Sequence, residues 1–265
     1  MKRLIFLFIA SGLLLFACTP SKQGKGGKPD QFSKVATPPS PTVALELKDA
    51  NQLLGQRRCT DAANLYLKFL DKYPKDPQAL NFLGLAYLCD ARYDLAQNAF
   101  RQSLTFAPGY SDVHNNLGVL YMEMKNYPEA KKEFMKALED VNYPVAGTYL
   151  NLAKLAFLQQ SYEESRALSR KVIDLNPKQP GPMLLYGLSL EKLGRVDEAC
   201  DSYRALLKIS PDNIEASYYL ANLLVQKNQI CEARLLYSRI VDVDPIGELG
   251  QKSIAVLKTL NCPPK

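Results

Sequence analysis

Proline recurs along most of this chain at intervals close to 34 residues, and this period limits the fold more than any other feature of the sequence. Small residues recur at the same interval, with one extra residue between the third and fourth units. The proline series agrees, because its one gap of 69 residues is a period of 34 plus one of 35. The prolines are Pro74, Pro108, Pro177, Pro211 and Pro245, and the small residues are Ala62, Ala96, Ala130, Ser165, Ala199 and Ala233. A fixed period of this length predicts a repeat array, in which each unit buries its apolar faces against its neighbours.

The units resemble the tetratricopeptide repeat, and the second unit shows the pattern best. Its pattern residues are Leu83, Gly84, Tyr87, Ala96, Phe100 and Pro108. A small residue lets the two helices of a unit approach closely, and the proline follows the second helix because it cannot continue it. The resemblance implies an all-α fold, a right-handed solenoid of six helix-turn-helix repeats with a C-terminal capping helix. The predicted repeats are residues 44–76, 77–110, 111–145, 146–179, 180–213 and 214–247, and the predicted cap is 248–262.

The chain begins with a segment that is typical of a secretory signal peptide, predicted over residues 1–17. Lys2 and Arg3 precede an apolar stretch, Leu4 to Phe16, which is shorter than the roughly 20 residues of a transmembrane helix. The stretch ends in Leu-Phe-Ala and Cys18, which resembles a bacterial lipobox. That resemblance implies cleavage before Cys18 and acylation of its thiol and new amino group, with palmitate among the chains. The alternative is an ordinary signal peptide with an incidental cysteine.

The residues after the cysteine predict a tether and a location. Residues 18–43 are rich in Pro, Gly, Ser and Lys and have no apolar period, so we expect the lipidated cysteine to be followed by a disordered segment. Thr19 stands where an Asp often retains such lipoproteins in the inner membrane. We therefore expect a lipid anchor in the outer membrane, with the folded domain facing the periplasm.

Composition and motifs argue against catalysis and against nucleic-acid binding. The formal charge of +6 comes mostly from residues 1–43, so the repeats are close to neutral and have no basic surplus for nucleic acid. The chain has one histidine, His114, which takes the place of a packing Trp in this repeat, and it has no glycine-rich phosphate loop, CxxC pair or HExxH pair. We expect no enzyme, no cofactor and no metal site, and we expect a monomeric binding scaffold.

The family pattern implies which residues line the groove formed by the first helices of the repeats. Apolar side chains there would anchor a partner segment, and amides can both donate to and accept from its backbone. The alternative is that several of these residues only pack against neighbouring helices. The cationic clamp with which some such repeats bind chaperone C-termini is missing. The predicted groove residues are Asn115, Asn116, Val119, Met122, Leu150, Asn151, Lys154, Phe157, Leu184 and Leu188.

Five cysteines remain besides Cys18, and export would place them in an oxidising compartment. Cys59 lies at the turn of the first repeat and Cys89 at the end of the first helix of the second repeat, and neighbouring turns lie side by side in a solenoid, so we predict a disulfide between them. Cys200, Cys231 and Cys262 recur at intervals of 31 residues. Cys231 could therefore pair with either neighbour, leaving one thiol over. The alternative is that these cysteines are buried free thiols.

Lipobox, tether and repeats together resemble the type IV pilus biogenesis and stability lipoproteins, the PilF/PilW/Tgl group. The most telling stretch is DVHNNLGVLYMEMKNYPEAKKEFMKALEDVNYPVAGTYLNLAKLA, with its Asn115-Asn116 pair and the insertion Asn142-Tyr143-Pro144. The resemblance implies a pilotin, which helps subunits of the pilus secretin assemble in the outer membrane and binds them through the groove. The alternative is an envelope adaptor for peptidoglycan enzymes or for outer-membrane protein assembly.

Overall fold

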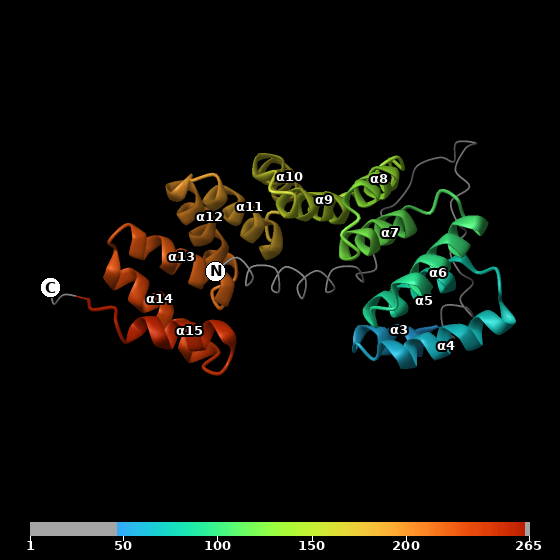
Figure 1. Cartoon of the computed structure of the whole chain (residues 1–265), viewed down its shortest axis with the longest axis horizontal. Helices are drawn as coiled ribbons and strands as arrows, with labels where there is room; N and C mark the ends of the chain where they lie inside the picture. Colours follow the sequence, from blue (N-terminus) through green and yellow to red (C-terminus); the bar gives the residue numbers. More distant parts are fainter. Residues whose placement is uncertain (1–46, 263–265) are drawn as a thin grey trace. The chain divides into compact units, whose positions relative to one another are not determined.

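The computed structural model describes residues 47–262, and this range holds thirteen α-helices and no strand (Figure 1). The predicted signal peptide, the predicted acylation site Cys18 and the predicted tether lie outside the described residues. No described helix is long and apolar enough to span a bilayer.

The helices form six consecutive pairs and one final helix, and each pair lies within one of the predicted repeat ranges. The labels follow Figure 1. The pairs are α3 (Lys48–Gly55) with α4 (Cys59–Lys72), α5 (Pro77–Cys89) with α6 (Tyr93–Phe106), α7 (Ser111–Glu123) with α8 (Tyr127–Ala137), α9 (Ala146–Leu158) with α10 (Tyr162–Leu175), α11 (Pro180–Lys192) with α12 (Val196–Ile209), and α13 (Ile214–Gln226) with α14 (Ile230–Val243). The final helix, α15, is Glu248–Leu257, so the helical part of the predicted cap is shorter than 248–262.

The chain divides into two compact units, and the boundary falls within α9, between Thr148 and Tyr149. In the first unit each helix from α3 to α8 packs on the next, and α5 also contacts α7, the first helix of the following repeat. In the second unit the same order runs from α10 to α15, and α13 contacts α15. This pairing of neighbours is that of an all-α repeat solenoid, as the sequence predicts.

Glycines in the first helices allow the two helices of a repeat to touch. A Cβ atom added to Gly84 would lie 2.5 Å from the ring of Phe100, and one added to Gly118 would lie 2.5 Å from the ring of Phe134. Gly187 stands in the same relation to Tyr203. These rings are fully buried, so the glycine and the aromatic residue of one repeat form a matched pair.

Where the aromatic residue is a tyrosine, the first helix supplies a partner for its hydroxyl. The hydroxyl of Tyr66 donates to Oδ1 of Asn51 at 2.6 Å, and the hydroxyl of Tyr237 donates to Oδ1 of Asn222 at 2.6 Å. Asn51 directly follows Ala50 and Asn222 directly follows Ala221, and these alanines belong to the same buried clusters as the tyrosines. Because a buried hydroxyl without a partner is costly, this pairing accounts for the two asparagines.

Two residues after the end of each first helix lies a residue with positive φ, between 55° and 75°. These residues are Arg57, Ala91, Lys125, Gln160, Gly194 and Asn228. The amide of the following residue donates to a carbonyl five residues earlier, as from Arg92 to Tyr87 at 2.8 Å and from Arg195 to Leu190 at 2.9 Å. This closing bond is that of a Schellman motif, which usually has glycine at the positive-φ position. Among these six turns, only the one at Gly194 has glycine at the positive-φ position.

Candidate functional site

The four predicted groove residues of the first unit all lie on α7, and all are buried. Asn116 keeps 4 % of its surface and Asn115 keeps 9 %, while Val119 and Met122 are equally enclosed. Nδ2 of Asn116 donates to Oδ1 of Asn81 on α5 at 2.9 Å. The Asn115 carbonyl accepts from the Thr148 hydroxyl at 3.1 Å. The amides thus bond to the neighbouring first helices, as in the alternative interpretation of the sequence.

The remaining predicted groove residues belong to the second unit, on α9 and α11. Leu150, Phe157 and Leu188 are buried, and the Phe157 ring meets the Tyr162 ring edge-on, with centroids 5.3 Å apart. The three that retain partial exposure are Asn151, Lys154 and Leu184. Leu150, Phe157 and Leu188 therefore contribute mainly to packing, whereas Asn151, Lys154 and Leu184 keep surface that a partner could contact.

The one-residue insertion between the third and fourth repeats forms a loop that is fastened to the start of α7. The side chain of Asp140 accepts from the Ser111 hydroxyl at 3.4 Å and from the Asn142 backbone N–H at 2.9 Å. The Tyr143 N–H donates to the Asp140 carbonyl at 3.1 Å. These bonds hold Tyr143 close to Asp112, in the first turn of α7.

Asp112 is an exposed carboxylate that neighbouring protein atoms nevertheless partly shield from water. This desolvation raises the pKa of Asp112, and a hydrogen bond from Tyr143 opposes the rise. Tyr110 and Tyr143 are half-buried, and their pKa values lie well above the ordinary one, because of desolvation first and the nearby Asp112 charge second. The groove prediction left out both tyrosines, although the inserted Tyr143 was a signal that this place differs from the other repeats.

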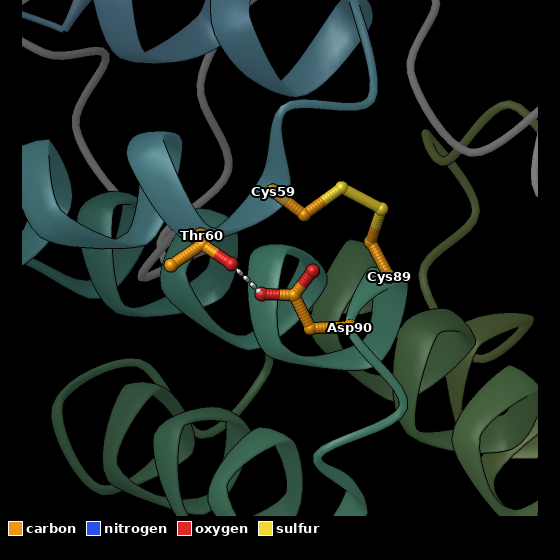
Figure 2. Close-up of a disulfide and its surroundings, with 4 residues drawn as sticks. All are labelled: Cys59, Thr60, Cys89 and Asp90. Atoms are coloured by element: carbon orange, nitrogen blue, oxygen red, sulfur yellow. Dashed lines mark hydrogen bonds between the residues drawn. A yellow bond between two sulfur atoms is a disulfide. The ribbon is translucent and has the colours of Figure 1, made fainter.

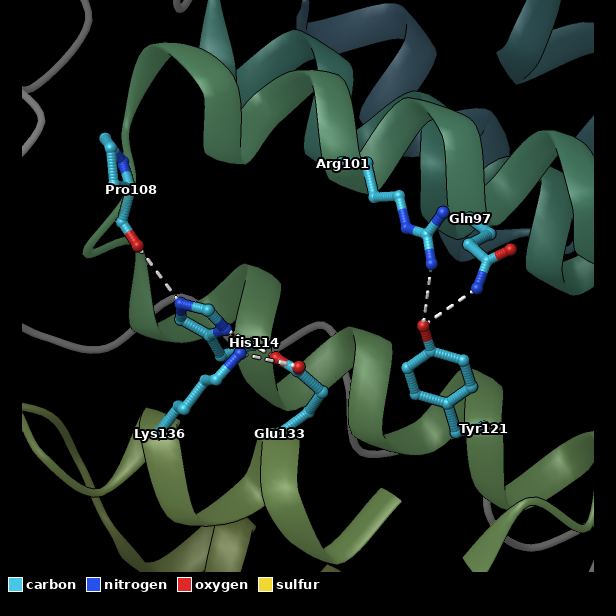
Figure 3. A network of polar contacts seen from close by, with 7 residues as sticks. All are labelled: Gln97, Arg101, Pro108, His114, Tyr121, Glu133 and Lys136. Atoms are coloured by element: carbon cyan, nitrogen blue, oxygen red, sulfur yellow. Dashed lines mark hydrogen bonds and ion pairs between the residues drawn. The ribbon is translucent and has the colours of Figure 1, made fainter. Parts of the chain in front are cut away.

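His114 bridges two elements from within the protein (Figure 3). Its Nε2 lies 3.1 Å from the Pro108 carbonyl, and its Nδ1 lies 2.7 Å from Oε2 of Glu133 on α8. Nζ of Lys136 donates to the other oxygen of Glu133 at 2.8 Å. Desolvation raises the pKa of Glu133, but the bonds to His114 and Lys136 outweigh it and leave the pKa below its ordinary value.

A second polar contact in the same view ties α6 to α7. The Tyr121 hydroxyl accepts from Nε2 of Gln97 at 2.8 Å and from Arg101 at 3.4 Å (Figure 3). Like the contacts of His114, these bonds connect neighbouring repeats. They give the histidine a structural role, in agreement with the packing role predicted from its position.

Two disulfides lie at the two ends of the described array. Cys59, the first residue of α4, is joined to Cys89, the last residue of α5, which is the predicted pair (Figure 2). Beside it the Thr60 hydroxyl donates to Asp90 at 2.8 Å. Cys59, Cys89 and Asp90 form the one described cluster with spacing suited to a metal, but both sulfurs are taken by the disulfide.

The second disulfide joins Cys231 to Cys262. Cys200, which was predicted as a disulfide candidate, is therefore not paired. Cys200 is a buried free thiol inside the core of the second unit, where desolvation raises its pKa. Cys231 lies in the first turn of α14 and Cys262 follows α15, and both are exposed. The first disulfide therefore links the start of α4 to the end of α5, and the second links the start of α14 to the segment after α15.

Comparison with known proteins identifies the repeats. Models described as tetratricopeptide repeat match residues 47–111, residues 90–142 and 190–246, and residues 145–176. Proteins of this kind ordinarily serve as binding scaffolds without catalysis.

Among curated proteins, human protein O-mannosyl-transferase TMTC1 is 22 % identical over 187 residues, which are 69 % of this chain and 21 % of the transferase. The type IV pilus assembly protein PilF of Pseudomonas aeruginosa is 28 % identical over 145 residues, which are 52 % of this chain and 58 % of PilF. The chain thus spans about a fifth of the transferase and just over half of PilF.

Two solved structures have the same fold. The crystal structure of PilW, described as a widely conserved type IV pilus biogenesis factor, matches with a TM-score of 0.72 and 19 % identity, over 82 % of this chain and 100 % of that chain. The Pseudomonas aeruginosa PilF structure matches with a TM-score of 0.69 and 20 % identity, over 81 % and 97 %. The chain belongs to the tetratricopeptide repeat family, and it resembles the type IV pilus proteins PilF, in sequence and fold, and PilW, in fold.

Proposed function

We propose that this protein is an outer-membrane lipoprotein that assists assembly of the type IV pilus secretin, acting as a pilotin. The observation that carries the proposal is the extent of the fold match, because the whole solved chain of PilW aligns with 82 % of this one. The similarity to PilF adds sequence support over 52 % of the chain. The human transferase, in contrast, is matched over only 21 % of its own length.

The N-terminal sequence supports the location. In the proposal, the acylated Cys18 anchors the protein in the outer membrane, and the polar segment that follows lets the repeats reach secretin subunits. Mass spectrometry of the mature N-terminal peptide tests this part, and a lipid mass on Cys18 is expected. An unmodified peptide that begins at another residue would refute the anchor.

The repeats supply the binding scaffold. In the proposal, the secretin contacts the side of the repeats formed by the first helices, where Asn151, Lys154 and Leu184 keep exposed surface. Within the first unit, the buried amides of α7 bond to the neighbouring first helices. A surface of this kind contributes binding energy through a few anchor residues surrounded by weaker contacts.

Co-purification from detergent-solubilised envelopes tests the partner. Capture of the protein through a C-terminal tag should enrich secretin subunits, and triple substitution of Asn151, Lys154 and Leu184 by alanine should reduce that enrichment at equal protein level. A variant with Lys258→Ala in the last described segment serves as the surface control. Enrichment of a peptidoglycan synthase, a peptidoglycan hydrolase or a barrel-assembly factor without secretin would favour the adaptor role and contradict the proposal.

A further inference from the structure

The disulfide between Cys59 and Cys89 has a carboxylate beside it. The two sulfurs and a carboxylate oxygen of Asp90 all lie within 4.8 Å of one another, and no other group of three histidine, cysteine or acidic side chains among residues 47–262 has that spacing. Cysteine sulfur and carboxylate oxygen are both ligands of zinc. The Cys231–Cys262 pair belongs to no such group among the described residues, so the carboxylate distinguishes the first disulfide from the second.

The carboxylate of Asp90 is held in place by the preceding repeat. The hydroxyl of Thr60, in the first turn of α4, donates to Oδ2 of Asp90 at 2.8 Å. The other carboxylate oxygen lies on the side of the disulfide (Figure 2). One oxygen therefore fixes the side chain and the other can bind an ion. Carboxylates that bind metals are commonly oriented by a hydrogen bond of this kind.

Asp90 stands at the C-terminal end of α5, where a negative charge is unfavourable. It is the C-cap residue of this helix, and the carbonyl end of the helix dipole repels a carboxylate. None of the ion pairs among the described residues involves Asp90. A cation beside Asp90 would compensate its charge. The residues that follow the other first helices are all non-acidic, namely Gln56, Met124, Gln159, Leu193 and Lys227.

The two cysteines are placed so that they can bind one ion once they are reduced. Their Cα atoms are 6.0 Å apart, and Cys59 is buried while Cys89 and Asp90 are partly exposed. Two thiolates on a tetrahedral zinc ion lie about 3.7 Å apart, because each Zn–S bond is about 2.3 Å long. Rotation of each side chain about its Cα–Cβ bond can provide that separation. Cys59 is also the first residue of α4, where the helix dipole favours a thiolate.

We propose that Cys59, Cys89 and Asp90 bind a zinc ion when the disulfide is reduced, with Thr60 orienting the carboxylate. A dithiol supplies two electrons and two protons to the S–S bond and is itself oxidised to a disulfide. Zinc then displaces the two thiol protons, which pass to solvent, and water completes the tetrahedral set. The ion replaces the disulfide as the link between the first two repeats. The proposal does not depend on the secretin assignment.

The test uses the full chain, reduced with dithiothreitol that is then removed by gel filtration under argon, and Co²⁺ as a spectroscopic probe. The reduced chain should give the visible absorption of tetrahedral cobalt and a near-ultraviolet thiolate-to-cobalt band, both saturating at one equivalent. One equivalent of Zn²⁺ should abolish both bands, because such sites prefer zinc. The chain that has not been reduced should give neither band, since its sulfurs are bonded to each other.

Variants assign the ligands. Replacing Cys59 and Cys89 together by alanine should abolish the cobalt bands, whereas replacing Cys231 and Cys262 together should leave them. In competition with a chromophoric chelator, Asp90→Asn should weaken zinc binding at least tenfold, and Thr60→Val should weaken it about tenfold because the orienting hydroxyl is lost. The matched control is Asp61→Asn, next to Thr60, which should leave zinc affinity unchanged, since Asp61 pairs with Arg58 at 2.7 Å.

Three results would overturn the proposal: no saturable cobalt spectrum in the reduced chain, an equal spectrum without Cys59 and Cys89, or undiminished zinc affinity in Asp90→Asn. If reduction removes the helical circular dichroism, zinc should restore it in the unaltered chain but not in the chain that lacks Cys59 and Cys89. Failure of zinc to restore it would then refute the site.

Discussion

Nδ2 of Asn116 donates a buried hydrogen bond of 2.9 Å to Oδ1 of Asn81, and this bond links the first helices of two successive repeats. The sequence pattern favours a partner-facing role for Asn116, and the structure gives its amide a structural one. Both side chains are almost inaccessible to water, so neither could exchange this bond for a partner without a local rearrangement.

Substitution of Asn116 by alanine should lower the free energy of unfolding by about 1–3 kcal/mol, because it removes a buried hydrogen bond and leaves the Asn81 oxygen with less compensation. Urea denaturation followed by circular dichroism measures the effect. The control is Asn98→Ala, on the exposed face of α6, which should change stability by less than about 0.5 kcal/mol. If Asn116→Ala left the stability unchanged and weakened partner binding, the structural role would be contradicted and Asn116 would be assigned to the binding surface.

The turn residues with positive φ predict stabilisation by glycine. Ala91 has a φ of 55°, which glycine adopts without strain. Ala91→Gly should raise the free energy of unfolding by about 0.5–1 kcal/mol, since the relieved strain exceeds the added entropy of the unfolded chain. Gly194→Ala, at the equivalent turn with a φ of 75°, should have the opposite effect. Thermal unfolding measures both, and a destabilised Ala91→Gly would contradict the assignment of strain.

The ion pair of Glu133 predicts acid sensitivity of the first unit. The pKa of Glu133 in the folded protein lies below its ordinary value of 4.5, so its pairing stabilises the fold above that value and is lost as the pH falls through the folded pKa. Between pH 7 and pH 3 the stability should therefore fall less in Glu133→Gln than in the unaltered protein. Glu129→Gln, an exposed first-turn acid in α8, is the control. An equal fall in both variants would show that Glu133 is not the group responsible.

The disulfides predict a defined pattern of reactive thiols. Under denaturing, non-reducing conditions, alkylation should modify Cys200 and spare the pairs Cys59–Cys89 and Cys231–Cys262. Replacing Cys59 and Cys89 together by alanine should lower stability by about 3–4 kcal/mol in the chain-entropy model, because the closed loop is about 30 residues long. Peptide mapping checks the pairing, and alkylation of Cys59 or Cys231 would contradict it.

Much of the fold was predictable because the repeat imposes local rules. Gly118 and Phe134 are 16 positions apart in the sequence and in contact in the structure, and Gly84 with Phe100 and Gly187 with Tyr203 repeat the arrangement at the same spacing. Period, small residues and prolines therefore suffice to place the helices. The predicted Cys59–Cys89 pair follows from the same regularity, since equivalent turns of successive repeats are neighbours.

The site was less predictable because a family pattern gives the direction of a side chain but not its partner. Asn116 and Asn81 are 35 residues apart, and nothing in either repeat alone indicates their hydrogen bond. The sequence also left undetermined which cysteine is the free thiol, because the equal spacing of Cys200, Cys231 and Cys262 fits either pairing. Burial in the core excluded Cys200, whereas Cys231 and Cys262 lie at the surface near the end of the array.

The central claim is that this protein promotes assembly of the pilus secretin, and the amount of heat-stable secretin multimer in envelopes tests it most directly. Deletion of the gene should leave secretin monomer present and remove most of the multimer. Expression of the unaltered protein should restore the multimer, whereas a Cys18→Ala variant that reaches the periplasm should restore much less. Multimer at the normal level in the deletion strain would contradict the account.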